Sequence, residues 1–376
     1  MKEGLKKTLK LPQLIALAAG GMIAAWMVEI QYWFSLTGTG SLLALILCAV
    51  FVLPLCFIYA EMTTMLPYAG GENVWVSNAF GWNTGWVCCW FVLLLYVMAM
   101  PTVSYGIASM IGYLHPITSG QTKLVAAIIL VVWFFLTNKE LKFIAKLQSI
   151  LFWATLIVSL AASVIFICSG SWSFSNFRGN LFPSGGKGFS AAIALLIMKF
   201  IGFDLIPQLS EEANFPKKKM WKAFVGSLGF TVLIYGMAVV GVGGIISQDW
   251  VLQTDIVDPR VADMIDMHWL GIVIVIMGTG TCLTTLSGFW MCAYSVWSCK
   301  AGTVYEKAGK GKQTWTAVSG KYHRWYFIYL LYGICTGCMG KLYLYDLRIN
   351  SRSCIFACCT VLPETASFSS GMGTSV

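Results

Sequence analysis

Long apolar stretches separated by short polar segments make up most of this chain. A stretch of about 20 apolar residues is long enough to cross the hydrocarbon core of a bilayer as a helix. We therefore predict an all-α polytopic membrane protein. Its expected spans are residues 13–36, 41–60, 86–112, 124–137, 146–168, 189–210, 223–246 and 269–297.

Two of these spans contain residues that a plain membrane helix avoids. The first span has the adjacent pair Gly20 and Gly21, followed by Glu29. Glycine weakens a helix, and a charge at the bilayer centre costs about 2.5–3.5 kcal/mol on insertion scales. The sixth span combines charged and helix-weakening residues over a short stretch: Lys199, Gly202, Asp204 and Pro207. Interrupted helices at corresponding places in two halves of a chain point to the binding site of a secondary transporter.

Composition supports a membrane protein and excludes a nucleic-acid-binding domain. The chain is 58% hydrophobic and only 11% charged, whereas soluble domains have about a quarter of their residues charged. The net charge of +9 comes largely from clusters beside the spans. These clusters are Lys2, Lys6, Lys7 and Lys10 before the first span, and Lys217, Lys218, Lys219 and Lys222 after the sixth. Such clusters mark cytoplasmic segments, so we expect a cytoplasmic N-terminus in the cell membrane.

Two polar motifs carry a family resemblance. The first, AEMTTMLPYAGGENVWVSNAFGW, runs from Ala60 to Trp82, and the second, FIGFDLIPQLSEEANFPKKK, runs from Phe200 to Lys219. Together they resemble the signatures of the amino acid–polyamine–organocation superfamily, over roughly residues 10–294. The resemblance implies a LeuT-type bundle of five plus five inverted repeats, and alternating-access transport of amino acids or related amines. It also implies that the segment between spans two and three is an inner gate, with Glu61, Pro67, Gly70, Gly71 and Glu72 as gate residues.

The same resemblance places the substrate at the two helix interruptions. Unwound backbone there would bind the carboxylate and the ammonium group of an amino acid, with Trp26 and Phe203 as side-chain walls. The expected binding residues are Gly20, Gly21, Met22, Ile23, Ala24, Trp26, Phe200, Ile201, Gly202, Phe203 and Asp204. Ala24 and Trp26 stand where the family usually has glycine, which suggests a site of altered size. The alternative is that Gly20 and Gly21 only allow close helix packing.

Intramembrane charges and hydroxyls are candidates for coupling transport to an ion. Glu29 and Lys199 form either a structural ion pair or part of a proton-coupling device. In sodium-coupled relatives, hydroxyls of the eighth span help to bind a cation, which makes Thr284, Thr285 and Ser287 candidates. The commoner role of such hydroxyls is hydrogen bonding between helices. Proton coupling or substrate exchange is the expected driving mode.

The character of the sequence changes after the eighth span. We divide the chain into a transporter core, residues 1–298, and an aberrant segment, residues 299–376, with a candidate ninth span at 325–345. Six of the thirteen Cys follow Tyr294. One interpretation is a zinc site, because Cys335, Cys338, Cys354 and Cys358 come near a four-Cys spacing. The interpretation that we favour is a shifted reading frame, which accounts for the Cys excess and the missing spans together.

The sequence thus predicts an amino-acid permease that binds its substrate, a proton or counter-substrate, and the lipid bilayer. We expect no cofactor and no metal. We expect no enzymatic activity, because no set of acid, base and nucleophile converges at one depth. The alternative function is that of a non-transporting remnant or a membrane-embedded binding subunit.

Overall fold

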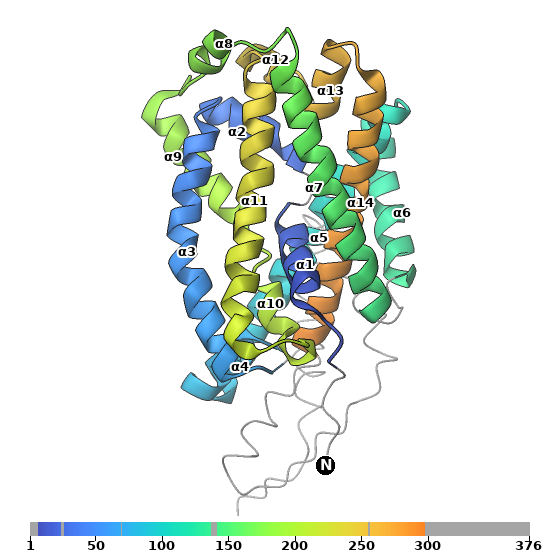
Figure 1. Cartoon of the computed structure of the whole chain (residues 1–376). Helices are drawn as coiled ribbons and strands as arrows, with labels where there is room; N and C mark the ends of the chain where they lie inside the picture. The colour runs from blue at the N-terminus through green and yellow to red at the C-terminus, as the bar shows by residue number, and fades with distance from the viewer. Residues whose placement is uncertain (1–6, 24–25, 69, 137–140, 255, 298–376) are drawn as a thin grey trace, which may run out of the picture. The chain divides into compact units, whose positions relative to one another are not determined.

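The computed structural model (Figure 1) describes residues 7–23, 26–68, 70–136, 141–254 and 256–297. Within these ranges the chain folds into α-helices joined by short turns, with two isolated β-bridges. This confirms the predicted all-α class. The segment 299–376 lies outside the described residues, together with the candidate ninth span at 325–345 and the four-Cys spacing.

The first predicted span is two helices rather than one. Helix α1 (Leu11–Met22) and helix α2 (Trp26–Thr37) meet at an angle of 51°. The adjacent glycines of the sequence lie in the last turn of α1, and most residues of both helices are buried. Glycine contributes little to holding a helix together, so the bend follows the weak point of the sequence.

The sixth predicted span is also interrupted. Helix α9 (Gly185–Ile197) continues into the 3-10 turn η1 (Met198–Phe200), and a new short helix, α10 (Leu205–Gln208), begins after the break. Gly202 lies within the break with φ of +137°, a backbone conformation that side chains with a Cβ rarely adopt.

The remaining spans are single helices. They are α3 (Ser41–Met65), α5 (Trp82–Leu114), α6 (Ser119–Leu136), α7 (Leu141–Cys168), α11 (Met220–Gly243) and α14 (His268–Trp297). Large apolar side chains on them are exposed, among them Phe51, Phe91 and Phe135 at 60–69%. A soluble protein rarely exposes apolar surface of this extent, whereas lipid covers it. Among the described residues, six helices are long and apolar enough to cross a membrane, or seven if the bent pair α1 and α2 is one span, whereas α6 is a shorter apolar helix.

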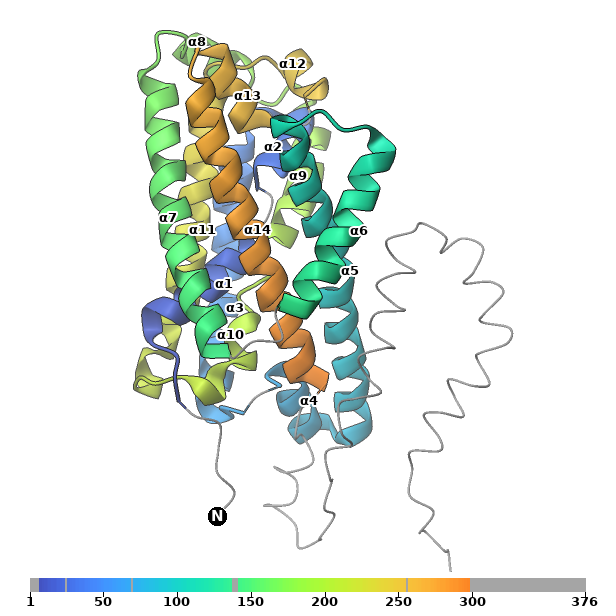
Figure 2. The ribbon, with the colours of Figure 1, turned by 90° about the vertical axis from the view of Figure 1, so that its right-hand side faces the viewer.

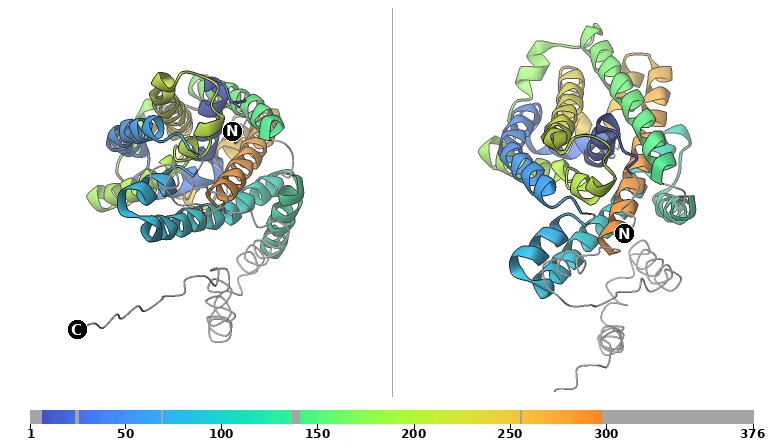
Figure 3. Two further views of the ribbon diagram at one scale, coloured as in Figure 1. Left: turned by 90° about the horizontal axis from the view of Figure 1, so that it is seen from below. Right: turned by 60° about the horizontal axis from the view of Figure 1, so that its bottom comes forward.

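Helix α1 lies at the centre of the helices that surround the two breaks. It packs against α7, α11 and α14, and α10 packs against α1 and α14 (Figures 2 and 3). Helix α5 runs along α14 and α6, while α2 packs against α9. The central position of α1 explains why its residues are among the most deeply buried.

Short helices mark the two ends of the spans. Helix α4 (Glu72–Phe80) lies with α10 at one end in Figure 1, here called the α4 end. Helices α8 (Phe174–Gly179), α12 (Gln248–Leu252) and α13 (Val257–Met264) lie at the other, here called the α13 end. The turns η2 (Ser210–Glu212) and η3 (Lys217–Lys219) follow α10 and lead into α11.

Candidate substrate site

The two helix breaks touch each other. A Cβ built on Gly202 would lie 2.8 Å from the backbone nitrogen of Met22 and 3.0 Å from the carbonyl carbon of Gly21. A Cβ on Gly21 would in turn meet the side chain of Leu205 at 2.6 Å. Real Cβ atoms do not approach backbone atoms so closely, so Gly202 needs to be glycine, whereas the end of the Leu205 side chain could move away from a Cβ at Gly21. Residues 181 positions apart in sequence thus form one backbone junction.

The carbonyl end of α1 is satisfied by hydroxyl groups from two other helices. Thr285 Oγ1 on α14 donates to the Gly20 carbonyl at 2.6 Å, and Tyr235 Oη on α11 donates to the Met22 carbonyl at 2.6 Å. The last carbonyls of a helix lack partners within the helix and carry partial negative charge. Because each carbonyl oxygen has a second lone pair, this end of α1 can still accept from an ammonium group or a hydroxyl.

In the described conformation Trp26 and Phe203 contact different helices. Trp26 is 2% exposed and faces Thr155 and Ser159 of α7 and Met277 of α14. Phe203 instead packs edge-on against Tyr59 of α3, with ring centroids 4.9 Å apart. Of the remaining predicted binding residues, Ile23 and Phe200 are fully buried, and Ala24 lies outside the described residues.

The Asp204 carboxylate holds the second break in shape. Its Oδ1 accepts from the backbone N–H of Gly202 at 2.7 Å, and its Oδ2 accepts from the Tyr96 hydroxyl on α5 at 2.7 Å. Ile201, on the other side of the glycine, donates its N–H to the Met198 carbonyl at 3.3 Å. A buried carboxylate is tolerated only when it is hydrogen-bonded or paired. The break is thus fixed from its own backbone and from a helix of the other half of the fold.

The predicted hydroxyls of α14 divide between two surroundings. Thr285 bonds α1 as described, and the backbone carbonyl of Thr284 accepts a hydrogen bond from Gln148 Nε2 on α7. Ser287 faces away from the breaks and accepts from Trp133 Nε1 of α6 at 3.0 Å. The hydroxyls of Thr285 and Ser287 thus hydrogen-bond to other helices, whereas the Thr284 hydroxyl donates to the Thr281 carbonyl of its own helix.

The polar segment after α3 packs onto α10. Gly70 and Gly71 have φ of +110° and +46°, and a Cβ on Gly71 would lie 2.7 Å from Pro207. Glu72 Oε2 accepts from Gln208 Nε2 at 2.7 Å. Burial, and then the negative charge of Asp204, raise the pKa of the Glu72 carboxyl. Pro67 is half-buried in this segment, whereas Glu61 on the last turns of α3 is exposed.

The N-terminal residues Thr8 and Leu9 pack at the α4 end as well. The N–H groups of Thr8 and Leu9 both donate to the Glu212 carbonyl at 3.0 Å, and Asn214 N–H donates back to the Leu9 carbonyl at 2.7 Å. Burial and the adjacent Glu211 raise the pKa of the Glu212 carboxyl to about 7. Backbone pairing of this kind leaves no sequence signal, so the sequence did not predict it.

The predicted intramembrane charges meet as an ion pair. Lys199 Nζ lies 2.5 Å from Glu29 Oε1, and the two side chains are 20% and 14% exposed. The pair joins α2 to η1, on the side of the breaks that faces the α13 end. Its two members are 170 residues apart in sequence.

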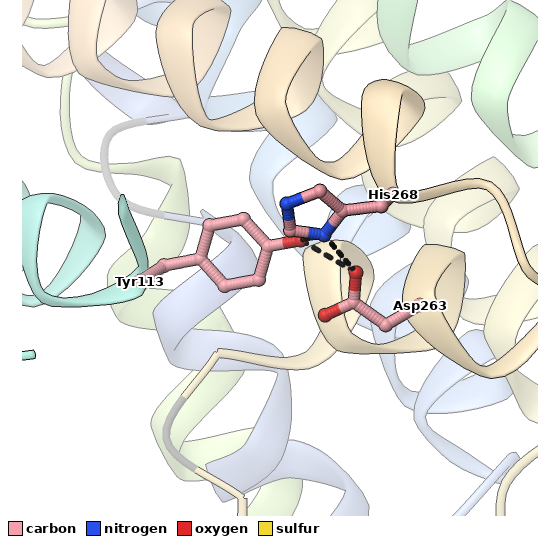
Figure 4. A network of polar contacts seen from close by, with 3 residues as sticks. All are labelled: Tyr113, Asp263 and His268. Carbon is pink, nitrogen blue, oxygen red and sulfur yellow. Dashed lines mark hydrogen bonds and ion pairs between the residues drawn. The ribbon is translucent and has the colours of Figure 1, made fainter. Parts of the chain in front are cut away.

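A polar network at the α13 end was not predicted. The hydroxyl of Tyr113 and the Nδ1 of His268 both lie within hydrogen-bond distance of Asp263 Oδ1, at 2.8 Å and 2.7 Å (Figure 4). It connects α5 to α13 and α14. Nearby Asp258 is buried, and burial raises its pKa well above the ordinary value. The segment from Ser247 to His268, which contains five Asp, is therefore at least partly packed against the membrane helices.

Comparison with known proteins assigns the family. The family model described as amino acid permease matches residues 9–365. The chain belongs to the amino acid permease family. As a member of the amino acid–polyamine–organocation superfamily it has the LeuT-type fold.

Individual relatives are distant and longer. The branched-chain amino acid permease BcaP of Lactococcus lactis subsp. cremoris is 25% identical over 247 residues, which is 59% of this chain and 52% of that protein. The gamma-aminobutyric acid permease of Bacillus subtilis is 24% identical over 253 residues, and its methylthioribose transporter is 23% identical over 252, each covering 62% of this chain and 54% of the relative. The chain spans about half the length of the curated relatives that it matches.

Proposed function

We propose that this permease-family chain moves amino acids or related amines across the cytoplasmic membrane by alternating access. The observation that carries the proposal is the junction of two interrupted helices at Gly21 and Gly202. Interrupted helices in the middle of a bundle provide backbone groups that can bind charged ends of a substrate, and they provide places where the bundle can bend. The relatives are named for transport of amino acids and other small solutes.

The polarity of the first break suits an amino acid. The α1 carbonyls of Gly20 and Met22 point toward hydroxyl donors, so an ammonium group is chemically suited to this end. Helix α2 begins at Trp26 on the other side of the break, and the positive polarity of a helix N-terminus suits a carboxylate. Because Gly202 lies against Met22, the described conformation leaves no room for even a methyl group at that point. We infer that substrate enters when this junction opens.

Sidedness follows from the lysine clusters. The turn η3 (Lys217–Lys219) lies at the α4 end, next to the N-terminal segment that pairs with Asn214. Positive clusters favour the cytoplasmic side, so we place the α4 end inside the cell. The packing of Gly71 on Pro207 and of Leu9 beside Glu212 would then form the cytoplasmic gate. A proton or a counter-substrate is the proposed driving partner.

Uptake into proteoliposomes tests the proposal. The purified chain is reconstituted, and uptake of radiolabelled leucine, lysine and γ-aminobutyrate is measured with an imposed pH gradient and, separately, with amino acid preloaded inside. We expect uptake by the wild-type chain, loss in Gly202→Leu, and changed substrate preference in Trp26→Ala. Gly229→Leu is the matched control, because a Cβ at that position of α11 meets nothing within 4 Å.

Two results would contradict the proposal in different ways. Uptake that is equal in wild-type and Gly202→Leu chains would place the transport path elsewhere. Saturable binding without uptake under either driving condition would favour a membrane-embedded binding subunit over a transporter.

A further inference from the structure

A cavity of about 320 Å³ lies between α2, α5 and the end of α9. This volume is at the lower end of the range for small-molecule sites. The glycine junction of the two breaks does not line it. Its wall includes Glu29, Tyr32 and Trp33 from α2, Thr102 and Tyr105 from α5, and Lys199 from η1. The cavity is thus a separate space, on the side of the breaks that faces the α13 end.

The Glu29–Lys199 ion pair forms the charged part of this wall. Both side chains are largely buried, at 14% and 20% exposed. Removing one partner of a buried pair leaves an uncompensated charge, which is strongly unfavourable. A ligand that separates the pair therefore has to supply a negative group for Lys199 and a positive group for Glu29 at the same time.

Two further side-chain atoms of the residues that line the cavity lack partners among the described residues. Glu29 Oε2 is buried and accepts no hydrogen bond, and Trp33 Nε1 is buried and donates none. Buried polar groups are nearly always hydrogen-bonded in native structures. Both atoms are enclosed by protein and have almost no accessible surface, so the ion pair alone supplies the charged part of the cavity wall.

We propose that this cavity binds a zwitterionic α-amino acid, with the ligand carboxylate on Lys199 and the ligand ammonium on Glu29. A zwitterion replaces both halves of the ion pair, whereas a simple amine or a simple carboxylate would leave one protein charge without a partner. Tyr32 and Tyr105, 54% and 45% exposed, line the space left for the ligand side chain. The choice of amino acids as ligand class rests on the proposed function.

Binding stoichiometry separates this site from the one at the helix breaks. Equilibrium dialysis of radiolabelled L-leucine against the purified full chain in detergent is expected to give two molecules per chain. The double variant Glu29→Gln/Lys199→Met should bind one, and the charge swap Glu29→Lys/Lys199→Glu should bind two, because it keeps a pair of opposite charges. Lys187→Met, an exposed lysine on α9, is the matched control and should bind two.

A second variant tests the cavity without touching its charges. Thr102 is exposed and lines the cavity, so Thr102→Trp should fill the space and remove one leucine. Competition at the cavity site should require both charges: 3-methylbutylamine and 4-methylpentanoate, which each lack one, should compete at least tenfold more weakly than leucine.

The outcomes distinguish the two sites. Equal leucine stoichiometry in wild-type, double-variant and Thr102→Trp chains would overturn the cavity site and leave the break site intact. One leucine in the wild-type chain and none in both variants would support the cavity and count against the break site. Equal competition by the amine or the carboxylate would overturn the zwitterion assignment.

Discussion

Gly202 is the backbone position on which the junction of the two breaks depends. Its φ of +137° excludes a side chain, and so does the Met22 nitrogen, which would lie only 2.8 Å from a Cβ at this position. We expect Gly202→Ala to destabilise the chain by about 1–3 kcal/mol, because it adds backbone strain and a contact with main-chain atoms that cannot rotate away. Thermal unfolding of the purified chain in detergent measures the effect as a lowered Tm.

The comparison for Gly202 is a glycine with free space around it. Gly229 on α11 is exposed and has open space at its Cβ. Because alanine favours helix over glycine by up to about 1 kcal/mol, Gly229→Ala should leave Tm unchanged or raise it slightly. A Gly202→Ala chain as stable as the Gly229→Ala chain would show that the junction is not tightly packed in solution.

The Glu212 carboxyl is expected to make the stability of the folded chain depend on pH. The Glu212 pKa rises from 4.5 to about 7 on folding, because burial and Glu211 disfavour the charged form. A raised pKa means that the folded chain holds this proton more tightly than the unfolded chain. The contribution of the protonated Glu212 carboxyl to the free energy of unfolding is therefore present in full below pH 4.5, and it is lost as the pH rises to about 7.

Substitution of Glu212 isolates this effect from the other titrating groups. The Tm of the Glu212→Gln chain minus that of the wild-type chain should increase between pH 4.5 and pH 7 and stay constant above. Glu61→Gln, at an exposed position of α3, should show a smaller change over the same range. A pH-independent difference for Glu212→Gln would mean that this carboxyl is solvated in the folded chain.

For the whole chain, the arrangement of the lysine clusters predicts its orientation in the membrane. The N-terminus and the α4 end should face the cytoplasm, and the α12–α13 segment should face outward. A site for a sequence-specific protease inserted after Gln253 should be cut in intact spheroplasts. A site placed ahead of Met1 should be cut only in inverted vesicles.

Removing one lysine cluster tests whether the positive charges set the orientation of the chain in the membrane. Replacing Lys217, Lys218, Lys219 and Lys222 with glutamine removes one positive cluster, and we expect a mixed population in which some chains are cut at the opposite site. If the unaltered chain is cut ahead of Met1 in spheroplasts, the assignment of inside and outside is wrong.

The sequence alone determined the spans and the places where two of them break. Hydrophobic length is a local property, and so is the weakness of a helix at Gly20 and Gly21 or at Gly202 and Pro207, so both could be predicted without knowing which segments are neighbours. The two polar motifs are also local features of the sequence, so they indicated the family without knowledge of the tertiary structure. The charges of Glu29 and Lys199 also indicated a partner within the membrane, because an isolated charge there is costly.

Only the tertiary structure decided which groups satisfy one another. Tyr96 bonds Asp204 from 108 positions away, and Tyr235 bonds the Met22 carbonyl from 213 away. No periodicity or motif marks such tyrosines, because their role depends on how the spans pack. Trp26 and Phe203 likewise contact different helices. The direction of a side chain depends on how its helix is rotated about its axis, and the sequence pattern near a break does not determine that rotation.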